Sequence, residues 1–184
     1  MPKKYFKKFL PSPEKLLENR FIRRLAPWIG HHNLWHLNRR SVAGGVAVGA
    51  FTGLLPGPIQ MISAAICSIV FRVNLPVAVV TTLYTNPFTI LPLYYVAYRI
   101  GGFATGRHSG PMPAFDFTLG EGGWLTLAGD FMRWVGSLGN EFFIGLFLLA
   151  CLLSFFSYFA VRGLWRLHAI VQWNKRKLRS SRLQ

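Results

Sequence analysis

The sequence predicts an all-α integral membrane protein with a re-entrant, broken helical hairpin, two transmembrane spans and amphipathic interfacial helices. Three observations predict this class. Hydrophobic residues make up 52% of the 184 residues and charged residues only 15%, whereas soluble domains carry about 25% charged residues. Of the 21 Lys and Arg, ten lie in residues 1–40 and seven in residues 162–184. Between these basic ends, long stretches contain no charged side chain.

The net charge of +15 indicates an anionic partner. Nucleic-acid binding would require basic residues interleaved with exposed aromatic residues on a water-soluble module. Here the basic residues flank apolar spans instead. We therefore expect the membrane and its anionic phospholipids as partners, and no nucleic acid.

Residues 1–40 are expected to form a basic cytoplasmic or interfacial segment. Within it, the pattern predicts a short helix over residues 12–26, which Ser12 can cap and Pro27 ends. Its leucines fall near one face while Lys and Arg occupy much of the rest, which is typical of a helix on an anionic surface. The alternative is a solvated helix that packs on the rest of the protein.

Residues 41–101 are expected to form a broken-helix membrane core. The thirty residues Ser41 to Val70 contain no charge, but Pro56-Gly57-Pro58 interrupts them. The halves have about 15 and 13 residues, so at roughly 1.5 Å per residue each reaches only about 20 Å, less than a ~30 Å hydrocarbon core. Two half-helices joined by a tight turn, which form a re-entrant hairpin, fit best. Such a turn has to be sheltered by protein or water.

A glycine stripe runs along the first half-helix, where Gly45, Gly49 and Gly53 recur four residues apart. Because these positions carry no side chain, another helix can approach the stripe closely. The sequence therefore predicts helix packing there.

Residues 73–98 contain no charge and are long enough to cross a bilayer, but Asn86-Pro87 and Pro92 interrupt them. The residue before a proline avoids the α-helical region. We therefore expect a kinked or broken span, and a second hairpin opposed to the first remains the alternative.

The last part of the chain divides by charge. Residues 102–141 are expected to be a polar extracytoplasmic connection, with an amphipathic surface helix at residues 124–138. Residues 142–161 are twenty apolar residues and form the clearest transmembrane helix. Residues 162–184 form a basic tail, and since basic segments stay in the cytoplasm, both termini are expected there.

Candidate ligand-binding residues are few, because residues 41–71 and 73–98 contain no Asp, Glu, His, Lys or Arg. That absence argues against a proton-driven carrier and against acid–base catalysis. An arginine beside half-helix amides can instead hold a phosphate or a lipid headgroup. The residues expected to bind such an anionic ligand are Gln60, Arg72, Asn74, Asn86 and Thr89.

No metal site, cofactor or catalytic residue is predicted. His32 and His36 have the spacing of zinc ligands on a helix, with His31 adjacent, but no HExxH pattern and no nearby Cys or Asp accompanies them. Walker and GxSxG motifs do not occur. We therefore expect the protein not to be an enzyme.

Residues 40–101 resemble a bacterial inner-membrane family catalogued as domain of unknown function 2062. The shared features are the glycine-rich half-helix, the proline turn followed by Gln60, the Arg72-x-Asn74-x-Pro76 junction and Asn86-Pro87-x-Thr89. The turn departs from the expected Pro-x-Pro-Gly, since this chain has Pro56-Gly57-Pro58-Ile59. The resemblance implies a protein of the bacterial inner (plasma) membrane without assigned biochemistry or catalytic residues.

Two functions remain open. The first is binding or transport of an anionic lipid or lipid phosphate through a broken-helix site, since half-helix ends at membrane depth form ligand sites. A homo-oligomer would then supply the cross-section that so short a chain lacks. The second is a structural or assembly subunit of an envelope complex, which docks a membrane-protein partner through the glycine stripe and the basic ends.

Overall fold

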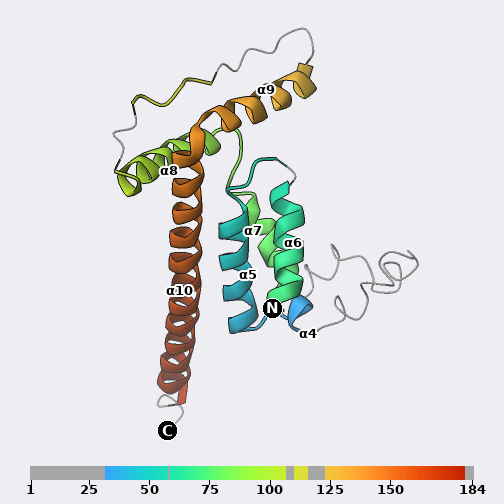
Figure 1. Cartoon of the computed structure of the whole chain (residues 1–184). Helices are drawn as coiled ribbons and strands as arrows, with labels where there is room; N and C mark the ends of the chain where they lie inside the picture. Colours follow the sequence, from blue (N-terminus) through green and yellow to red (C-terminus); the bar gives the residue numbers. More distant parts are fainter. Residues whose placement is uncertain (1–31, 58, 107–109, 116–122, 181–184) are drawn as a thin grey trace, which may run out of the picture.

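The computed structural model describes residues 32–57, 59–106, 110–115 and 123–180. The regular structure of these residues is entirely helical, which confirms the predicted all-α class (Figure 1). The helix predicted at residues 12–26 lies outside the described residues, as do Pro58 and parts of the polar connection. The helices are α4 His32–Trp35, α5 Arg39–Thr52, α6 Ile59–Phe71, α7 Leu75–Thr82, α8 Ile90–Ala104, α9 Gly123–Ser137 and α10 Gly139–Ser180.

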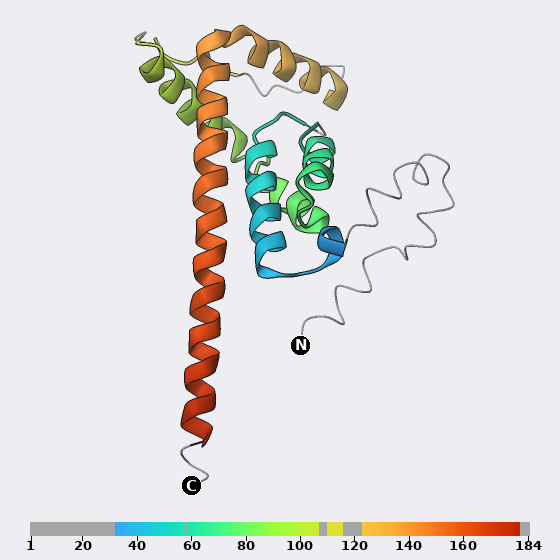
Figure 2. The same ribbon diagram turned by 60° about the horizontal axis from the view of Figure 1, so that its bottom comes forward.

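Helices α5, α6 and α7 lie side by side and alternate in direction (Figures 1 and 2). The turn after α5 contains Gly57 with φ +64°, a left-handed conformation that suits glycine. Asparagines start two of the helices, because Asn38 Oδ1 accepts a hydrogen bond from the Ser41 amide at 2.8 Å and Asn74 Oδ1 accepts one from the Val77 amide at 3.0 Å. The chain therefore folds back after α5, and again after α6.

The glycine stripe of α5 packs against α7 of the same chain. A Cβ at Gly45 would lie 2.6 Å from the Asn74 carbonyl oxygen, and a Cβ at Gly49 would overlap the Ala78 carbonyl oxygen. The third glycine, Gly53, faces the ring of Tyr84. These three glycines therefore permit the close approach of a second helix, and that helix is α7.

A second close crossing joins α8 to α10. A Cβ at Gly101 would overlap the Glu141 carbonyl oxygen, and a Cβ at Gly145 would overlap the Ala97 carbonyl oxygen. The aromatic rings of Tyr94 and Phe142, both fully buried, pack beside this crossing with centroids 5.0 Å apart. Helix α9 lies across this end of α10 (Figure 2) and corresponds to the predicted amphipathic helix.

Helix α10 includes the predicted transmembrane segment. Among the described residues, one helix is long and apolar enough to cross a membrane, over Gly139–Trp173. Only 22% of its most apolar stretch is buried inside the protein, so it is not a core helix of a globular domain. Phe147, Phe155 and Phe156 are among its exposed residues. This finding supports association of the chain with a membrane.

The described chain begins and ends toward the same end of the molecule, where the last turns of α10 extend past α4 and the start of α5 (Figures 1 and 2). The predicted span 73–98 is divided into α7, a turn over residues 83–89, and α8. Helix α8 does not continue the direction of α7 but runs across α10 at the opposite end (Figure 2). The predicted break at Asn86-Pro87 thus falls within this turn.

Candidate functional site

Hydroxyl groups from the α7–α8 segment cap the carboxyl end of α5. The Tyr84 hydroxyl donates to the Ala50 carbonyl at 2.8 Å, and the Thr85 hydroxyl donates to the Gly53 carbonyl at 2.6 Å. The Tyr94 hydroxyl donates to the Leu54 carbonyl at 3.0 Å. Leu54, Thr85 and Tyr94 are all buried.

These three bonds satisfy backbone carbonyls at and just after the end of α5. The last carbonyls of a helix have no partner within the helix. Pro56 and Pro58 carry no amide hydrogen, so neither can donate to the carbonyl four residues earlier. Pro58 follows Leu54 by four residues in the sequence, and the Tyr94 hydroxyl supplies the donor for the Leu54 carbonyl. The broken end of α5 is therefore satisfied by protein groups rather than by water, which is what an apolar surrounding requires.

Gln60 joins this arrangement from the first turn of α6. Its Oε1 lies 2.7 Å from the Thr85 hydroxyl, which also lies 2.9 Å from the Thr82 carbonyl. The hydroxyl has a single hydrogen, so it can donate to only one of three acceptors at a time: Gln60 Oε1, the Thr82 carbonyl or the Gly53 carbonyl. Gln60 and Thr85 together tie the turn after α5 to the turn after α7.

Asn86 and Thr89 stabilise the turn before α8. Asn86 Oδ1 accepts hydrogen bonds from the amides of Phe88 and Thr89, at 3.0 and 3.1 Å. Thr89 Oγ1 donates to the Tyr84 carbonyl at 2.7 Å and accepts from the Asn86 amide at 2.9 Å. The motif Asn86-Pro87-x-Thr89 is thus a local cap. The Asn86 side chain bonds the backbone at Phe88 and Thr89, and the Thr89 side chain bonds the backbone at Tyr84 and Asn86.

Asn74 is the most deeply buried of the predicted ligand residues, with 1% of its surface exposed. Its side-chain Oδ1 caps α7, and its side-chain Nδ2 donates to the His36 carbonyl at 3.3 Å. Its backbone N–H donates to the Ser41 carbonyl at 3.1 Å. These bonds tie the start of α7 to the start of α5. The side chain is therefore committed to the fold.

Arg72 and Asn86 are both exposed, but the Asn86 side chain bonds backbone amides, whereas the Arg72 side chain makes no hydrogen bond with the described residues. It ends α6 with φ +53°, the only positive φ among the described residues that are not glycine. This left-handed conformation costs an L-residue on the order of 1–2 kcal/mol. Two residues later, the Asn74 amide bonds the Ser41 carbonyl, which places Arg72 beside the exposed pair Arg39 and Arg40.

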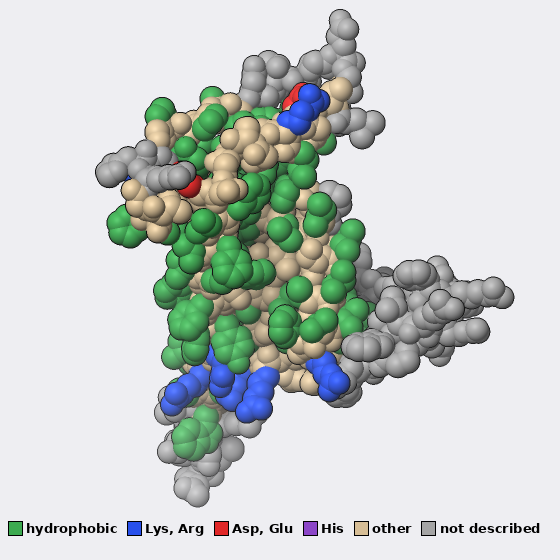
Figure 3. All heavy atoms as spheres, viewed as in Figure 1, with side chains coloured by type: hydrophobic (Ala, Val, Ile, Leu, Met, Phe, Trp, Pro, Cys, Tyr) green, Lys and Arg blue, Asp and Glu red, His purple; other side chains and the backbone are tan. Residues whose placement is uncertain are grey.

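Further arginines lie at this level on α10. Phe51 of α5 packs edge-on against Phe147 of α10, with ring centroids 6.0 Å apart. The two helices run in opposite directions, so Arg40 and Arg162 lie about 17 and 23 Å from this contact toward the same end. Figure 3 shows blue side chains at the lower end of a band of apolar side chains. We call Arg39, Arg40, Arg72 and Arg162 the basic end.

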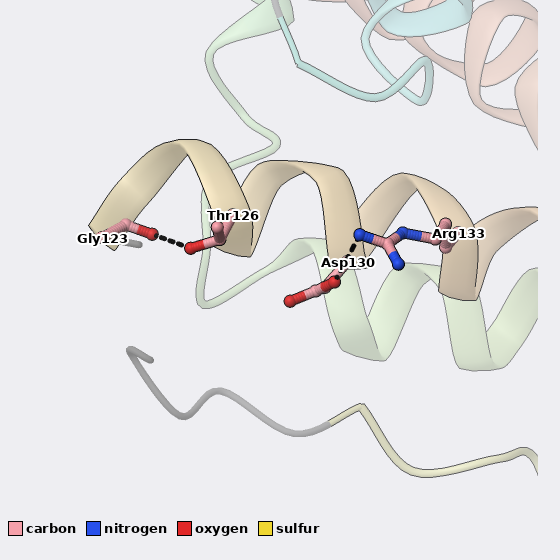
Figure 4. A network of polar contacts seen from close by, with 4 residues as sticks. All are labelled: Gly123, Thr126, Asp130 and Arg133. Atoms are coloured by element: carbon pink, nitrogen blue, oxygen red, sulfur yellow. Dashed lines mark hydrogen bonds and ion pairs between the residues drawn. The ribbon is translucent and has the colours of Figure 1, made fainter. Parts of the chain in front are cut away.

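The opposite end carries both signs of charge. On α9, Arg133 pairs with Asp130 at 3.1 Å, and the Thr126 hydroxyl donates to the Gly123 carbonyl at 2.8 Å (Figure 4). Both charged side chains are more than half exposed, so this ion pair contributes little to stability. The asymmetry between the two ends agrees with the charge segregation in the sequence.

The five predicted ligand residues do not form one site. Arg72 and Asn74 lie at the start of α7, whereas Gln60, Asn86 and Thr89 lie beyond its end. Eight helical residues separate the two groups, which corresponds to about 12 Å. The sequence did not predict Tyr84 and Tyr94 as capping residues, because both look like ordinary aromatic residues of an apolar run. Within the described residues, no three His, Cys, Asp or Glu side chains are placed to hold a metal ion.

Comparison with known proteins gives one kind of match. A family model described as "Uncharacterized protein conserved in bacteria (DUF2062)" matches residues 22–174. Neither a curated protein nor a solved structure matches the chain. The matched range includes all of α4 to α9 and most of α10.

Proposed function

Because this chain belongs to the DUF2062 family of uncharacterized bacterial proteins, its function has to be inferred from its own residues, and we propose that it is an inner-membrane protein that binds an anionic lipid phosphate at its basic end. Arg72 is the central residue of the proposed site. The single observation that carries the proposal is the position of this exposed arginine, in a strained conformation, at the end of an exposed apolar helix face.

The proposed placement in the bilayer follows α10. Its uncharged segment 142–161 measures about 30 Å, the thickness of a hydrocarbon core. The basic end then lies at the cytoplasmic interface, and α8 and α9 lie at the outer one. The α5–α6 hairpin enters from the cytoplasmic side, and Leu54 near its tip packs in the same cluster as Phe142. The hydroxyl caps on α5 support this placement, since they remove the need for water at the turn.

The proposed lipid site combines a face of α6 with the basic end. Ile62, Ile66 and Val70 are spaced four residues apart and are 60%, 57% and 62% exposed. They form an apolar stripe, which we call the α6 stripe, and it leads along the helix to Arg72. An acyl chain can lie along such a stripe while its phosphate contacts the guanidinium group. Arg39 and Arg40 add positive charge on the neighbouring helix.

The side chain at Arg72 supports a role in binding. A left-handed conformation would favour glycine at this position, and a bulky arginine is retained there at a cost in stability. The left-handed backbone itself closes α6, since the Val73 amide donates to the Ser68 carbonyl at 3.0 Å, so we assign the arginine side chain, and not the backbone, to the ligand. The side chains of the other predicted ligand residues all hydrogen-bond to groups of the chain itself.

Lipid retention tests the proposal. Full-length protein with Arg72→Gln is extracted from membranes containing phosphatidic acid and cardiolipin, and its retained lipids are counted by native mass spectrometry. Arg133→Gln is the matched control, because it removes an exposed arginine from the opposite end. We expect several-fold less anionic lipid on Arg72→Gln and wild-type retention on Arg133→Gln. Equal retention on both variants contradicts the proposal and favours the assembly role.

Arg72→Gly separates lipid binding from folding. Glycine adopts φ +53° without strain, so this variant should be more stable than the wild type by about 1 kcal/mol. We expect it to lose anionic lipid nonetheless. Transport of a lipid phosphate, the other activity that the sequence left open, is measured as movement of a fluorescent lipid phosphate between the leaflets of proteoliposomes, with Arg72→Gln and Arg133→Gln.

A further inference from the structure

The last part of α10 carries an apolar face that the protein itself leaves uncovered. Residues 163–173 are all exposed. Leu164, Leu167 and Val171 are spaced three and four residues apart, so they lie on one side of the helix, and their exposed fractions are 66%, 60% and 50%. Ile170 adjoins them and is 44% exposed. We call these four residues the tail stripe.

Basic residues lie beside and beyond the tail stripe. Arg162 and Arg166 lie four residues apart on the side away from the tail stripe, and the sequence after Trp173 adds Lys175, Arg176, Lys177 and Arg179. Trp165 and Trp173 are 40% and 63% exposed. An apolar stripe, a basic opposite face and tryptophans are the features of a helix that lies in the interface of an anionic leaflet.

The length of α10 places the tail stripe outside the hydrocarbon core. The apolar helix Gly139–Trp173 has 35 residues and measures about 52 Å, whereas a hydrocarbon core is about 30 Å thick. When residues 142–161 span the core, a straight α10 carries the tail stripe into water. Exposing four large apolar side chains there is unfavourable, at roughly 25 cal/mol per Å² of apolar surface.

Gly163 stands between the spanning segment and the tail stripe. A Cβ at this glycine would meet no atom within 4 Å, so close packing does not explain the residue. Glycine weakens a helix by about 1 kcal/mol relative to alanine. The helix is therefore easiest to bend where the cytoplasmic interface begins.

We infer that residues 164–180 bend at Gly163 and lie on the cytoplasmic leaflet, with the tail stripe in the acyl region and the basic face on anionic headgroups. This inference rests on the membrane placement proposed above. We choose the leaflet over a second copy of the chain, because two parallel tails would bring together the seven Lys and Arg that each chain carries in residues 162–184. The leaflet is already present at the end of the spanning segment and has the complementary charge.

Pulsed electron–electron double resonance on the full-length protein tests the bend. Spin labels are attached to Ile144→Cys and Val171→Cys in a Cys67→Ser, Cys151→Ser background. A straight helix separates these positions by about 40 Å, while a right-angle bend at Gly163 gives about 31 Å. In nanodiscs of phosphatidylcholine with phosphatidylglycerol we expect the shorter distance, with a smaller short-distance population in phosphatidylcholine alone. A distance near 40 Å, or equal populations in both lipids, overturns the inference.

Matched variants test the tail stripe. Leu167→Glu places a charge in the stripe, and Ala169→Glu places the same charge on the opposite face. Both positions are exposed, so neither change disturbs the packed part of the protein. We expect Leu167→Glu to restore the longer distance and Ala169→Glu to keep the shorter one. Equal behaviour of the two variants contradicts the tail stripe as the membrane-facing side.

Singly labelled protein separates the remaining outcomes. Dipolar coupling between chains at Val171→Cys alone would show a second copy on the tail stripe and overturn the leaflet as occupant. A label at Leu152→Cys that water-soluble relaxation agents reach would overturn the membrane placement, and with it the proposed function. If Leu152→Cys is protected and Val171→Cys is reached, the inference alone fails.

Discussion

Replacing Tyr94 by phenylalanine removes one hydroxyl from the interior and leaves the ring in place. The hydroxyl donates to the Leu54 carbonyl at 3.0 Å, and the exposed fractions of the two residues are 0% and 1%. Pro58 has no amide hydrogen to take over this bond. Tyr94→Phe therefore leaves a buried carbonyl without a donor, at a cost of about 1–3 kcal/mol.

The loss is measured as a change in thermal unfolding of the purified protein in nanodiscs, followed by tryptophan fluorescence. For a chain of this size, 1 kcal/mol corresponds to roughly 2–4 °C, so we expect the midpoint to fall by roughly 2–12 °C. The neighbouring residue offers the control, since Tyr95 is 51% exposed on the same helix. Tyr95→Phe should change the free energy of unfolding by less than about 0.5 kcal/mol.

Two results would refute the reasoning. If Tyr94→Phe unfolds at the wild-type temperature, the Leu54 carbonyl has another source of hydrogen bonds, such as water at the turn. If Tyr94→Phe and Tyr95→Phe lose the same stability, the effect belongs to tyrosine in α8 in general. In either case the hydroxyl caps no longer explain how the broken end of α5 is satisfied, and the turn need not lie in an apolar surrounding.

Two other predictions concern packing and topology. Gly145→Ala places a Cβ onto the Ala97 carbonyl and should destabilise the α8–α10 crossing by about 1–3 kcal/mol or more. The control Gly136→Ala places its Cβ in open space. Equal unfolding temperatures of the two variants would contradict the crossing. With both native cysteines replaced by serine, Gly110→Cys should react with an impermeant thiol reagent in intact cells and Leu37→Cys only after permeabilisation, and reaction of both in intact cells would contradict the proposed membrane placement.

Helix positions in the core were predictable from the sequence because prolines and polar junctions interrupt otherwise uniform apolar runs. The half-helices expected around Pro56-Gly57-Pro58 correspond to α5 and α6 within a few residues, and the junction at Arg72 to Asn74 falls between α6 and α7. The apolar segment 142–161 lies inside α10, but the helix continues to Ser180. Lysine and arginine are good helix formers, so the basic tail extends the helix instead of ending it.

The arrangement of the helices was less predictable. Gly101 and Gly145 are 44 positions apart, and neither belongs to a run of glycines spaced four residues apart. A glycine without such a pattern has several explanations, and only the crossing of α8 and α10 shows that both let two backbones touch. The stripe of three glycines on α5 was a stronger signal because its period matches a helix face. Even so, the sequence did not identify α7 as the helix that packs there.

The candidate site shows why polar residues in an apolar sequence are ambiguous. A buried amide or hydroxyl can bind a ligand or can satisfy the backbone at a helix break, and both uses place it next to a proline. Hydrogen-bond saturation separates the two uses. Asn74, Asn86 and Thr89 bond the backbone of their own junctions, and Gln60 bonds Thr85. The Arg72 side chain is exposed and caps no backbone group of the described residues, which is why the proposed site centres on it.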